Sequence, residues 1–454
     1  MRAATIATLT PPQTAPATLP RALPLLGHAL RFKRQPLEFL ESLRPLGDVV
    51  AIRLGPKPAY VVNSPELVRR MLVAEAQAFE AGLLLEKVKP FVGNGLIALR
   101  GTDHTRHRRL LQPAFHHSSI ARYVEVMRQL AAERVCSWRE GQQVVADVEM
   151  MELATAVVGK TLFSMDLDRD VVDEVVGSMP MLLEGIRKRL MAPTELLEKL
   201  PTPSNRRFNT AIRRIHQVVE DVIAEYRRTG IDHGDLASMM LSARDEHSGQ
   251  GFSDVQVRDE ALTMLAAGTQ TTATTIAWAL HILSTHDEIQ QRAHAQIHQV
   301  LGDRNLTFDD IERLDYIRRL LTETLRLYPP AWLLSRRAVS EVTLGDHILP
   351  RGASILFSPY ALHRDPKTYP DPDVFDPDRW IPERAKSIPR PAFIPFGAGN
   401  RQCLGEGFAW VEATVVLTVI LQQWRVRLVP GQIIRKVALA TLVPSRLPLL
   451  LQRP

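Results

Sequence analysis

The amino-acid sequence predicts a mainly α-helical protein with small β-sheets, an α+β fold built as one large domain. Apolar residues recur at helical spacing along most of the chain, and the longest such segment covers about residues 254–284. Two short segments, 49–54 and 59–62, flank a Gly-Pro-Lys-Pro turn and are typical of a β-hairpin. With 45% hydrophobic and 23% charged residues, the 454-residue chain has enough apolar material for a single core.

The N-terminal residues 1–23 contain several prolines and little periodicity. We therefore expect a flexible arm there, followed by a domain that covers residues 24–454. No apolar stretch approaches the roughly 20 residues that a spanning helix needs, and no signal-peptide pattern is present. The two cysteines, Cys136 and Cys403, lack a paired spacing. These features predict a cytoplasmic protein without disulfides or a membrane span.

The net charge of +6 is compatible with a polyanionic partner, but the basic residues are spread along the chain. One dense run, His-Thr-Arg-His-Arg-Arg at 104–109, is an exception. A solvated helix face explains such a run better than polyanion binding does. We therefore predict no nucleic-acid partner.

The long helix is predicted to begin after Ser253, which has the spacing of a capping box with Gln256. Its interior carries Ala-Ala-Gly-Thr-Gln-Thr-Thr at 266–272, where weak helix formers predict a local distortion. One interpretation is a close helix crossing over small residues. The other is a locally opened helix whose hydroxyl and carbonyl groups face a ligand. The local sequence leaves both interpretations open.

A helix around residues 320–327 is predicted to end at the Tyr-Pro-Pro sequence 328–330. It carries Glu323 and Arg326 at i,i+3, on one face and able to pair. The same spacing occurs elsewhere in the chain and indicates little by itself. The later sequence Phe-Asp-Pro-Asp-Arg-Trp adds Arg379, which can complete a buried Arg-Glu-Arg network.

Residues 396–405 read Phe-Gly-Ala-Gly-Asn-Arg-Gln-Cys-Leu-Gly and precede an apolar helical segment over 408–421. The glycines permit tight turns, and a cysteine at a helix N-terminus lies in a field that stabilises its thiolate. An isolated cysteine is more often an inert core residue. Here the glycine spacing, the basic Arg401 and the following helix favour a metal-ligating thiolate at Cys403.

These motifs resemble those of the cytochrome P-450 family, and the resemblance extends from about residue 24 to residue 450. Phe396, Gly399, Arg401, Cys403 and Gly405 match the family's haem-loop pattern Phe-x-x-Gly-x-Arg-x-Cys-x-Gly. The family also has a structural triad, and three residues of this chain resemble it in the expected order before the haem loop: Glu323, Arg326 and Arg379.

The resemblance implies haem b bound through the thiolate of Cys403, with Phe396 and Gly405 in the cofactor-binding loop. It also implies four basic partners for the two haem propionates, because charge-assisted hydrogen bonds neutralise a partly buried dianion. These partners are His104, Arg108, Arg336 and Arg401.

The small-residue stretch of the long helix resembles the family's oxygen-activating segment, with Gly268 in it and Thr271 at the catalytic threonine position. The family usually has Asp or Glu where this chain has Gln270. A carboxamide orients water but does not release and recover a proton in the working pH range. Three explanations stay open: another group relays protons, turnover is slow and releases peroxide, or the natural reaction needs no such delivery.

The activity implied by the resemblance is monooxygenation of a small apolar substrate with O2, such as a terpenoid or another secondary metabolite. No flavin reductase follows the haem loop, so we expect separate ferredoxin and ferredoxin reductase partners and a monomeric enzyme. The expected substrate pocket is mostly apolar and contains Leu84, Phe91, Met181, Ala267, Trp332, Leu333, Leu334 and Leu442.

Two other classes of protein share most of these motifs. A haem-thiolate enzyme that catalyses oxidative coupling, peroxide-driven oxidation or group transfer would be compatible with Gln270. A haem sensor or carrier fits less well, because an oxygen-activating threonine and an apolar pocket would have no purpose in it. Product analysis with labelled oxygen separates monooxygenation from the first alternative.

Overall fold

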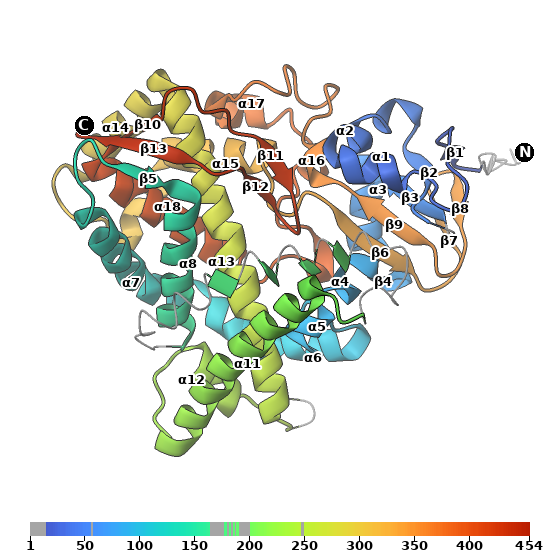
Figure 1. Cartoon of the computed structure of the whole chain (residues 1–454), viewed down its shortest axis with the longest axis horizontal. Coiled ribbons are helices and arrows are strands. Elements are labelled where there is room, and N and C mark those ends of the chain that lie inside the picture. Colours follow the sequence, from blue (N-terminus) through green and yellow to red (C-terminus); the bar gives the residue numbers. More distant parts are fainter. Residues whose placement is uncertain are drawn as a thin grey trace, which may run out of the picture.

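The computed structural model describes residues 15–55, 58–163, 177–178, 181–182, 185–186, 188–189, 200–246 and 249–454. Helices dominate these residues, and their strands form four separate sheets. The predicted mainly α-helical α+β class is confirmed. Helix α13 (Asp254–Thr285) crosses the molecule between a helical part and the largest sheet (Figure 1).

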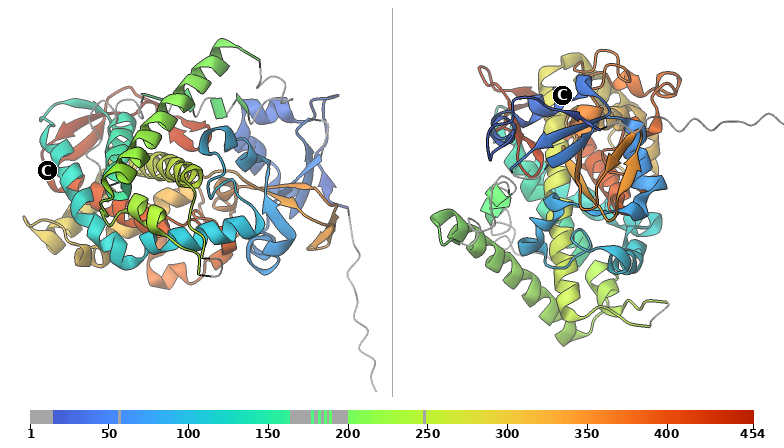
Figure 2. Two further views of the ribbon diagram at one scale, coloured as in Figure 1. Left: turned by 90° about the horizontal axis from the view of Figure 1, so that it is seen from below. Right: turned by 90° about the vertical axis from the view of Figure 1, so that its right-hand side faces the viewer.

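The helical part contains most of the long helices, and α11 crosses α13 obliquely at the surface (Figure 2). The long helices are α7 (His117–Cys136), α8 (Ala146–Phe163), α11 (Pro203–Thr229), α14 (Asp287–Leu301), α15 (Asp315–Leu327) and α18 (Glu406–Gln423). The shorter helices are α1 (Ala29–Arg34), α2 (Pro36–Glu41), α3 (Pro65–Arg69), α4 (Leu83–Glu86), α5 (Lys89–Val92), α6 (Gly101–Leu111), α12 (Leu236–Ser242), α16 (Pro359–Leu362) and α17 (Pro382–Ala385). Among the described residues, no helix is both long and apolar enough to cross a membrane.

The largest sheet lies on the other side of α13. Its strands follow the order β1 (Ala17–Thr18), β2 (Val49–Arg53), β3 (Pro58–Val62), β9 (Ser354–Phe357), β6 (Leu334–Ala338) and β4 (Phe79–Ala81). β2 and β3 pair antiparallel with Val50 opposite Val61, which confirms the predicted hairpin. A three-stranded sheet has the order β10 (Arg425–Leu428), β13 (Pro448–Gln452) and β5 (Gln143–Val145). One two-stranded sheet pairs β11 (Lys436–Ala438) with β12 (Leu442–Pro444), and another pairs β7 (Val342–Leu344) with β8 (His347–Leu349).

Part of the expected N-terminal arm lies within the described residues. β1 pairs parallel to β2, and the Leu19 side chain that follows it is buried. This part of the chain is therefore attached to the edge of the largest sheet. The expected boundary between arm and domain at residues 23 and 24 stays a prediction.

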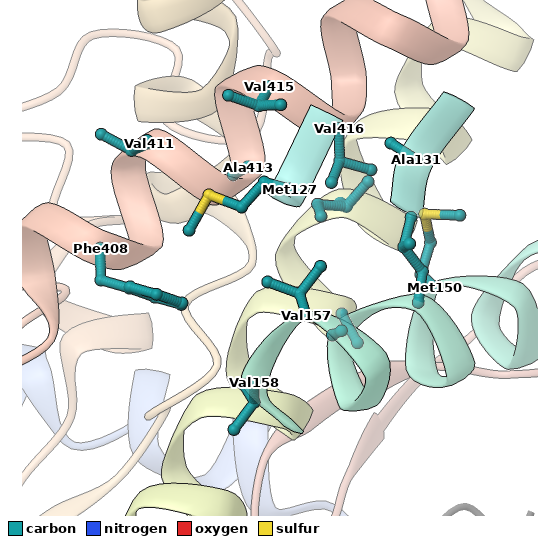
Figure 3. Close-up of a cluster of buried hydrophobic side chains, with 14 of the residues drawn as sticks. Met127, Ala131, Met150, Val157, Val158, Phe408, Val411, Ala413, Val415 and Val416 are labelled. Carbon is teal, nitrogen blue, oxygen red and sulfur yellow. The ribbon is translucent and has the colours of Figure 1, made fainter. Parts of the chain in front are cut away.

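The main hydrophobic core lies where α7, α8 and α18 pack around α13. Figure 3 shows Met127 of α7, Val157 of α8 and Val416 of α18 within one cluster of apolar side chains, and all three are fully buried. Helix α18 is apolar nearly all round, which is typical of a helix buried on every side. Each fully buried side chain of this kind contributes roughly 1.5–3 kcal/mol to folding. The core therefore holds α18 and α13 in fixed positions.

Helix α13 has the predicted start. The Ser253 hydroxyl accepts from the Gln256 backbone N–H, and the Gln256 side chain accepts from the Ser253 N–H, which confirms the capping box. The helix then continues without interruption to its end, so the weak helix formers within 266–272 do not break it. At Gly268 a Cβ would come within 2.9 Å of Val158 Cγ2 on α8. Close packing against α8 therefore offsets the weak helix propensity of this stretch.

Glu323, Arg326 and Arg379 form a network sealed from solvent. Arg326 Nη2 and Nε donate to the Glu323 carboxylate at 2.7 and 2.8 Å, and Arg379 Nε lies 3.4 Å from Glu323 Oε1. The indole N–H of Trp380 and the backbone N–H of Asp376 also donate to Glu323. Each buried charge is thus paired and hydrogen-bonded, which is the condition for tolerating it in the core. The network attaches α15 to the segment around residue 379.

Glu323→Ala is expected to destabilise the fold by about 3–5 kcal/mol, because it leaves buried guanidinium groups without their counter-charge. Thermal melting and the yield of soluble protein measure the effect. Glu125→Ala is a matched control, since Glu125 pairs with Arg128 at the same i,i+3 spacing but on the surface, where such a pair contributes less than about 1 kcal/mol. Equal melting temperatures for the two variants would contradict a structural role for the network.

Candidate active site

A cavity of about 320 Å³ lies between α13 and the loop that carries Cys403. Its walls come from parts of the chain that are distant in sequence, including α6, α8, α13, β6 and the start of α18. Most of the lining side chains are apolar, and several basic side chains interrupt them. The fold thus brings together residues as distant in sequence as Leu85 and Ala413.

Two glycines shape the loop before Cys403. Gly397 and Gly399 have φ values of +70° and +71°, in the left-handed region that other residues rarely adopt. Gly399 also packs against the Leu72 carbonyl oxygen, in the π-helical turn Arg70–Ala74, where a Cβ would overlap it. The Cys403 N–H closes the loop by donating to the Phe396 carbonyl at 2.8 Å. The spacing of the motif therefore has a direct backbone explanation.

The Cys403 thiol faces the cavity just before the start of α18. Its sulfur is accessible from within the cavity, although protein surrounds it on its other sides. Burial raises the pKa of the thiol, and a hydrogen bond from the Gly405 backbone acts in the opposite direction. A metal cation at the sulfur favours the thiolate. Cys403 therefore has the access and the supporting hydrogen bond that a metal ligand needs.

Four basic side chains line the cavity: His104 and Arg108 from α6, Arg336 from β6, and Arg401 from the haem-loop motif. Burial, followed by the charges of Arg401, Arg108 and Arg336, lowers the pKa of His104 to about 4. Burial and then Arg401 lower the pKa of Arg336 to about 10. These shifts show mutual repulsion within the cluster, which a bound dianion would relieve.

One face of α13 opens toward the cavity. Ala267 is exposed and Gly268 and Thr271 are half-buried, whereas Thr269 and Gln270 beside them are buried. The Thr271 hydroxyl donates to the Ala267 carbonyl at 2.7 Å. Small side chains at positions 267 and 268 leave space beside this hydroxyl. The structure thus brings the predicted threonine and the predicted cysteine to one cavity.

Comparison with known families accounts for this arrangement. Residues 17–449 match the family model described as Cytochrome P450. The chain belongs to the cytochrome P450 family. The resemblance carried by the haem-loop motif is thereby confirmed over nearly the whole chain.

Two similar proteins come from Streptomyces. "Cyclooctat-9-en-7-ol 5-monooxygenase" of Streptomyces melanosporofaciens is 42% identical over 414 residues, which cover 91% of this chain and 90% of that protein. "Pentalenene oxygenase" of Streptomyces avermitilis is 39% identical over 429 residues, which cover 94% of this chain and 95% of that protein. This cytochrome P450 is accordingly a haem-thiolate monooxygenase.

The residues around the cavity of this cytochrome P450 fit haem b. Cys403 offers the thiolate ligand, and the basic cluster offers donors for two propionates. Arg108, Arg336 and Arg401 each donate to a nearby backbone carbonyl. A guanidinium group has five N–H donors in a fixed geometry, so each can also bind a carboxylate. The donor set and the charge of the cavity therefore match the cofactor of the family.

Gln270 lies outside the cavity lining, although it occupies the position of the family's usual acid. Its side chain is buried, and its Nε2 donates to Thr274 Oγ1 at 3.1 Å. Its Oε1 has no hydrogen-bond partner among the described residues. Residues four apart lie on the same face of a helix, and here that face is turned away from the one that carries Thr271. In this conformation the amide does not reach the cavity.

Two of the eight predicted pocket residues, Ala267 and Leu334, line the cavity. Neighbours one position away replace two of the others, because Leu85 and Ala331 line the cavity while Leu84 and Trp332 do not. The spacing of motifs does not resolve such a one-residue shift. The structure places the following six predicted residues in or against hydrophobic clusters: Leu84, Phe91, Met181, Trp332, Leu333 and Leu442.

Two adjacent acids of α13, which no motif indicates, hold the loop before α6. Asp259 Oδ2 accepts from the Asn94 backbone N–H at 2.7 Å, and Glu260 Oε2 accepts from the Leu96 N–H at 3.0 Å. Glu260 Oε1 also lies 2.5 Å from His107 Nδ1. Acids near a helix start usually lie in solvent, so the sequence carries no signal for this burial. Since Leu96 lines the cavity, the anchor fixes part of its wall.

The basic run at 104–109 serves two purposes on two faces of α6. His104 and Arg108 line the cavity. Arg106, His107 and Arg109 instead contact groups between residues 245 and 260. The run therefore combines cofactor binding with structural contacts, and neither requires a polyanionic partner.

Cys403→Ala is expected to abolish the red-shifted Soret band that thiolate ligation produces in the reduced carbon monoxide complex. Purified holoprotein is reduced under carbon monoxide and its absorption spectrum is recorded. Cys136→Ala is the control, because Cys136 is exposed at the end of α7 and should leave the spectrum unchanged. A thiolate spectrum that persisted without Cys403 would overturn the ligand assignment.

Proposed function

We propose that this cytochrome P450 oxidises a small cyclic terpenoid with O2. The observation that carries the proposal is that Cys403 and Thr271 line the same cavity, whose wall is largely apolar. The similar proteins named for cyclooctat-9-en-7-ol and pentalenene oxidation support the substrate class. Both similarities extend over at least 90% of each chain, so they include the parts that form the cavity.

Some residues of the site would bind the cofactor, and Thr271 offers a hydroxyl group for hydrogen bonds within the cavity. Cys403 would hold the haem iron, and the basic cluster would hold the propionates. The bound haem supplies the chemistry that reduces O2 and inserts one oxygen atom into a C–H bond. Thr271 presents its hydroxyl to the cavity and donates to the Ala267 carbonyl. Rotation of that hydroxyl lets it exchange hydrogen bonds with water beside the substrate.

The cavity wall favours an apolar substrate or one with a single hydroxyl. Val158, Met264 and Leu334 are among its apolar side chains. The charged side chains of the lining are the basic cluster already assigned to the propionates, so an ionic substrate would find no further charged partner among the described lining residues. Thr263 and Thr275 also line the cavity and are able to hydrogen-bond an alcohol.

We also propose that a ferredoxin and its reductase deliver electrons to a monomeric enzyme in the cytoplasm. The net charge of +6 would steer an acidic ferredoxin toward the protein. Arg108 is close to the cysteine loop, since it donates to the Gln402 carbonyl at 2.7 Å. Cys136 and Cys403 are both free thiols, as expected in a reducing compartment.

Cyclooctat-9-en-7-ol and pentalenene are expected to shift the Soret band of the ferric holoprotein, because an apolar compound that fills the cavity changes the surroundings of the iron. Optical titration measures the shift for these two compounds and for a panel of cyclic terpene hydrocarbons and alcohols. A carboxylate derivative of similar size serves as the control and should give little change. A shift caused by charged compounds but by no member of the apolar panel would contradict the proposed substrate class.

Thr271→Ala is expected to lower the fraction of electrons that end in oxygenated product by roughly tenfold, since a fully effective acid–base group contributes about 10²–10⁴-fold and water replaces part of its role. Product and consumed reductant are measured under labelled O2. Thr269→Ala is the matched control, because Thr269 makes the same backbone hydrogen bond four residues back but is buried outside the cavity lining. Unlabelled product, or unchanged coupling in Thr271→Ala, would favour group transfer or oxidative coupling instead.

A further inference from the structure

A buried histidine and a buried carboxylate join α6 to α13 behind the cavity wall. The side chains of His107 and Glu260 are 2% and 0% exposed, and His107 Nδ1 lies 2.5 Å from Glu260 Oε1. Phe252 packs edge-on against the imidazole, with the ring centroids 4.9 Å apart. Neither residue of the pair belongs to the described lining of the cavity. A buried charge is tolerated only when its hydrogen bonds are made, so the groups bonded to this pair show what it holds in place.

The hydrogen bonds around His107 fix its tautomer. Gln256 Oε1 accepts from the Ser253 N–H at 3.0 Å, as part of the capping box of α13. The amide nitrogen of Gln256, which is a donor only, therefore faces His107 Nε2 at 3.4 Å. That ring nitrogen accepts, so the imidazole is neutral and carries its proton on Nδ1, from which it donates to Glu260. The carboxylate of Glu260 carries the charge of the pair.

Glu260 connects the cavity wall with the helix that carries two of the basic cavity residues. Its Oε2 accepts from the Leu96 backbone N–H at 3.0 Å, and the Leu96 side chain lines the cavity. Its Oε1 accepts from His107, which lies on α6 beside Arg108 and three residues after His104. One carboxylate therefore fixes the place of an apolar part of the wall relative to the basic cluster.

Two glycines bring the loop before α6 into direct contact with α13. At Gly93 a Cβ would overlap the Asp259 carboxylate, and at Gly95 a Cβ would overlap the Thr263 hydroxyl. The Thr263 side chain itself lines the cavity. Such close packing leaves no flexible side chain to absorb a displacement, so a change at Glu260 moves the wall itself.

We propose that His107 and Glu260 are positioning residues that set which C–H bond of the substrate is oxidised. The inference rests on the proposed oxidation of a cyclic terpenoid, which offers many C–H bonds of similar polarity, so that the shape of the wall selects among them. By holding Leu96 in place relative to α6, the pair fixes the substrate side of the cavity against the side that binds the propionates. A displacement of about 1 Å that begins far from the reacting atoms costs about 100-fold in rate.

His107→Leu tests the pair, because it removes the donor and fills a similar space. The dissociation constant of a bound terpenoid, measured by optical titration, is expected to rise about tenfold, and the ratio of its oxidation products to change. His107→Asn should restore most of both, since its amide N–H occupies the place of the Nδ1–H. The Soret band of the reduced carbon monoxide complex should keep its thiolate position in both variants, because Cys403 is unchanged.

Arg109→Leu is the matched control for a general loss of stability. Arg109 also lies on α6, and it pairs with the buried Asp245, which lies outside the described cavity lining. Thermal melting should fall in Arg109→Leu as well as in His107→Leu, whereas affinity and product ratio should change only in His107→Leu. An equal change of product ratio in both variants would show a structural role alone and overturn the inference.

A double variant tests the order of donors and acceptors. Glu260→Gln leaves one acceptor oxygen for two donors, the Leu96 N–H and the His107 Nδ1–H, so it should change the product ratio as His107→Leu does. Adding Gln256→Glu reverses the order: the new carboxylate accepts from an Nε2–H, Nδ1 accepts from the new amide, and the amide oxygen is left for Leu96. The double variant should therefore recover the wild-type product ratio.

Nitrogen NMR of labelled histidines in the reduced carbon monoxide complex, which is diamagnetic, gives a measurement without turnover. The signal that is absent in His107→Asn identifies His107. In the wild-type protein it should show a protonated Nδ1 and an unprotonated Nε2, and in the double variant the reverse. A wild-type imidazole protonated on Nε2 alone would contradict the arrangement on which the inference depends.

Wild-type affinities and product ratios in both His107→Leu and Glu260→Gln would also overturn the inference. If His107→Leu does not fold, Glu260→Gln, its double variant and the wild-type NMR decide the question. If the wild-type enzyme oxidises a terpenoid and the variants give the same products, this inference fails alone. If the wild-type enzyme oxidises no terpenoid, the proposed function fails with it.

Discussion

The close packing of α13 against α8 is the constraint on which the site depends. Gly268 allows Val158 to approach one side of the helix, and the core around α18 holds another side. These contacts leave the face with Ala267 and Thr271 open to the cavity. A bulkier residue at position 268 would force the helices apart and change the space beside Thr271. The same glycine therefore serves both packing and the shape of the site.

Buried charges in this protein fall into two groups according to how well they are neutralised. The Glu323 network and the Asp259–Glu260 anchor are satisfied by partners within the chain, and they hold segments in place. The basic cluster around Arg336 lacks such balance, as its lowered pKa shows, and Glu412 lacks a firm hydrogen bond. Folding tolerates incomplete neutralisation at these positions because the main core supplies enough stability. Incomplete neutralisation is what leaves the basic cluster available for a cofactor.

The sequence by itself determined the features that depend on local spacing: the helical class, the capping box at Ser253, the β2–β3 hairpin, the Glu323 network and the loop around Cys403. Each of these is encoded by residues close together or by a motif with few other uses. The tertiary structure alone decided which side chains face the cavity, as with Leu85 in place of Leu84 and Ala331 in place of Trp332. It also decided that α13 continues unbroken through residues 266–272 and that Glu260 and Glu412 are buried. These features depend on side-chain direction and on neighbours distant in the chain, which spacing along a sequence does not contain.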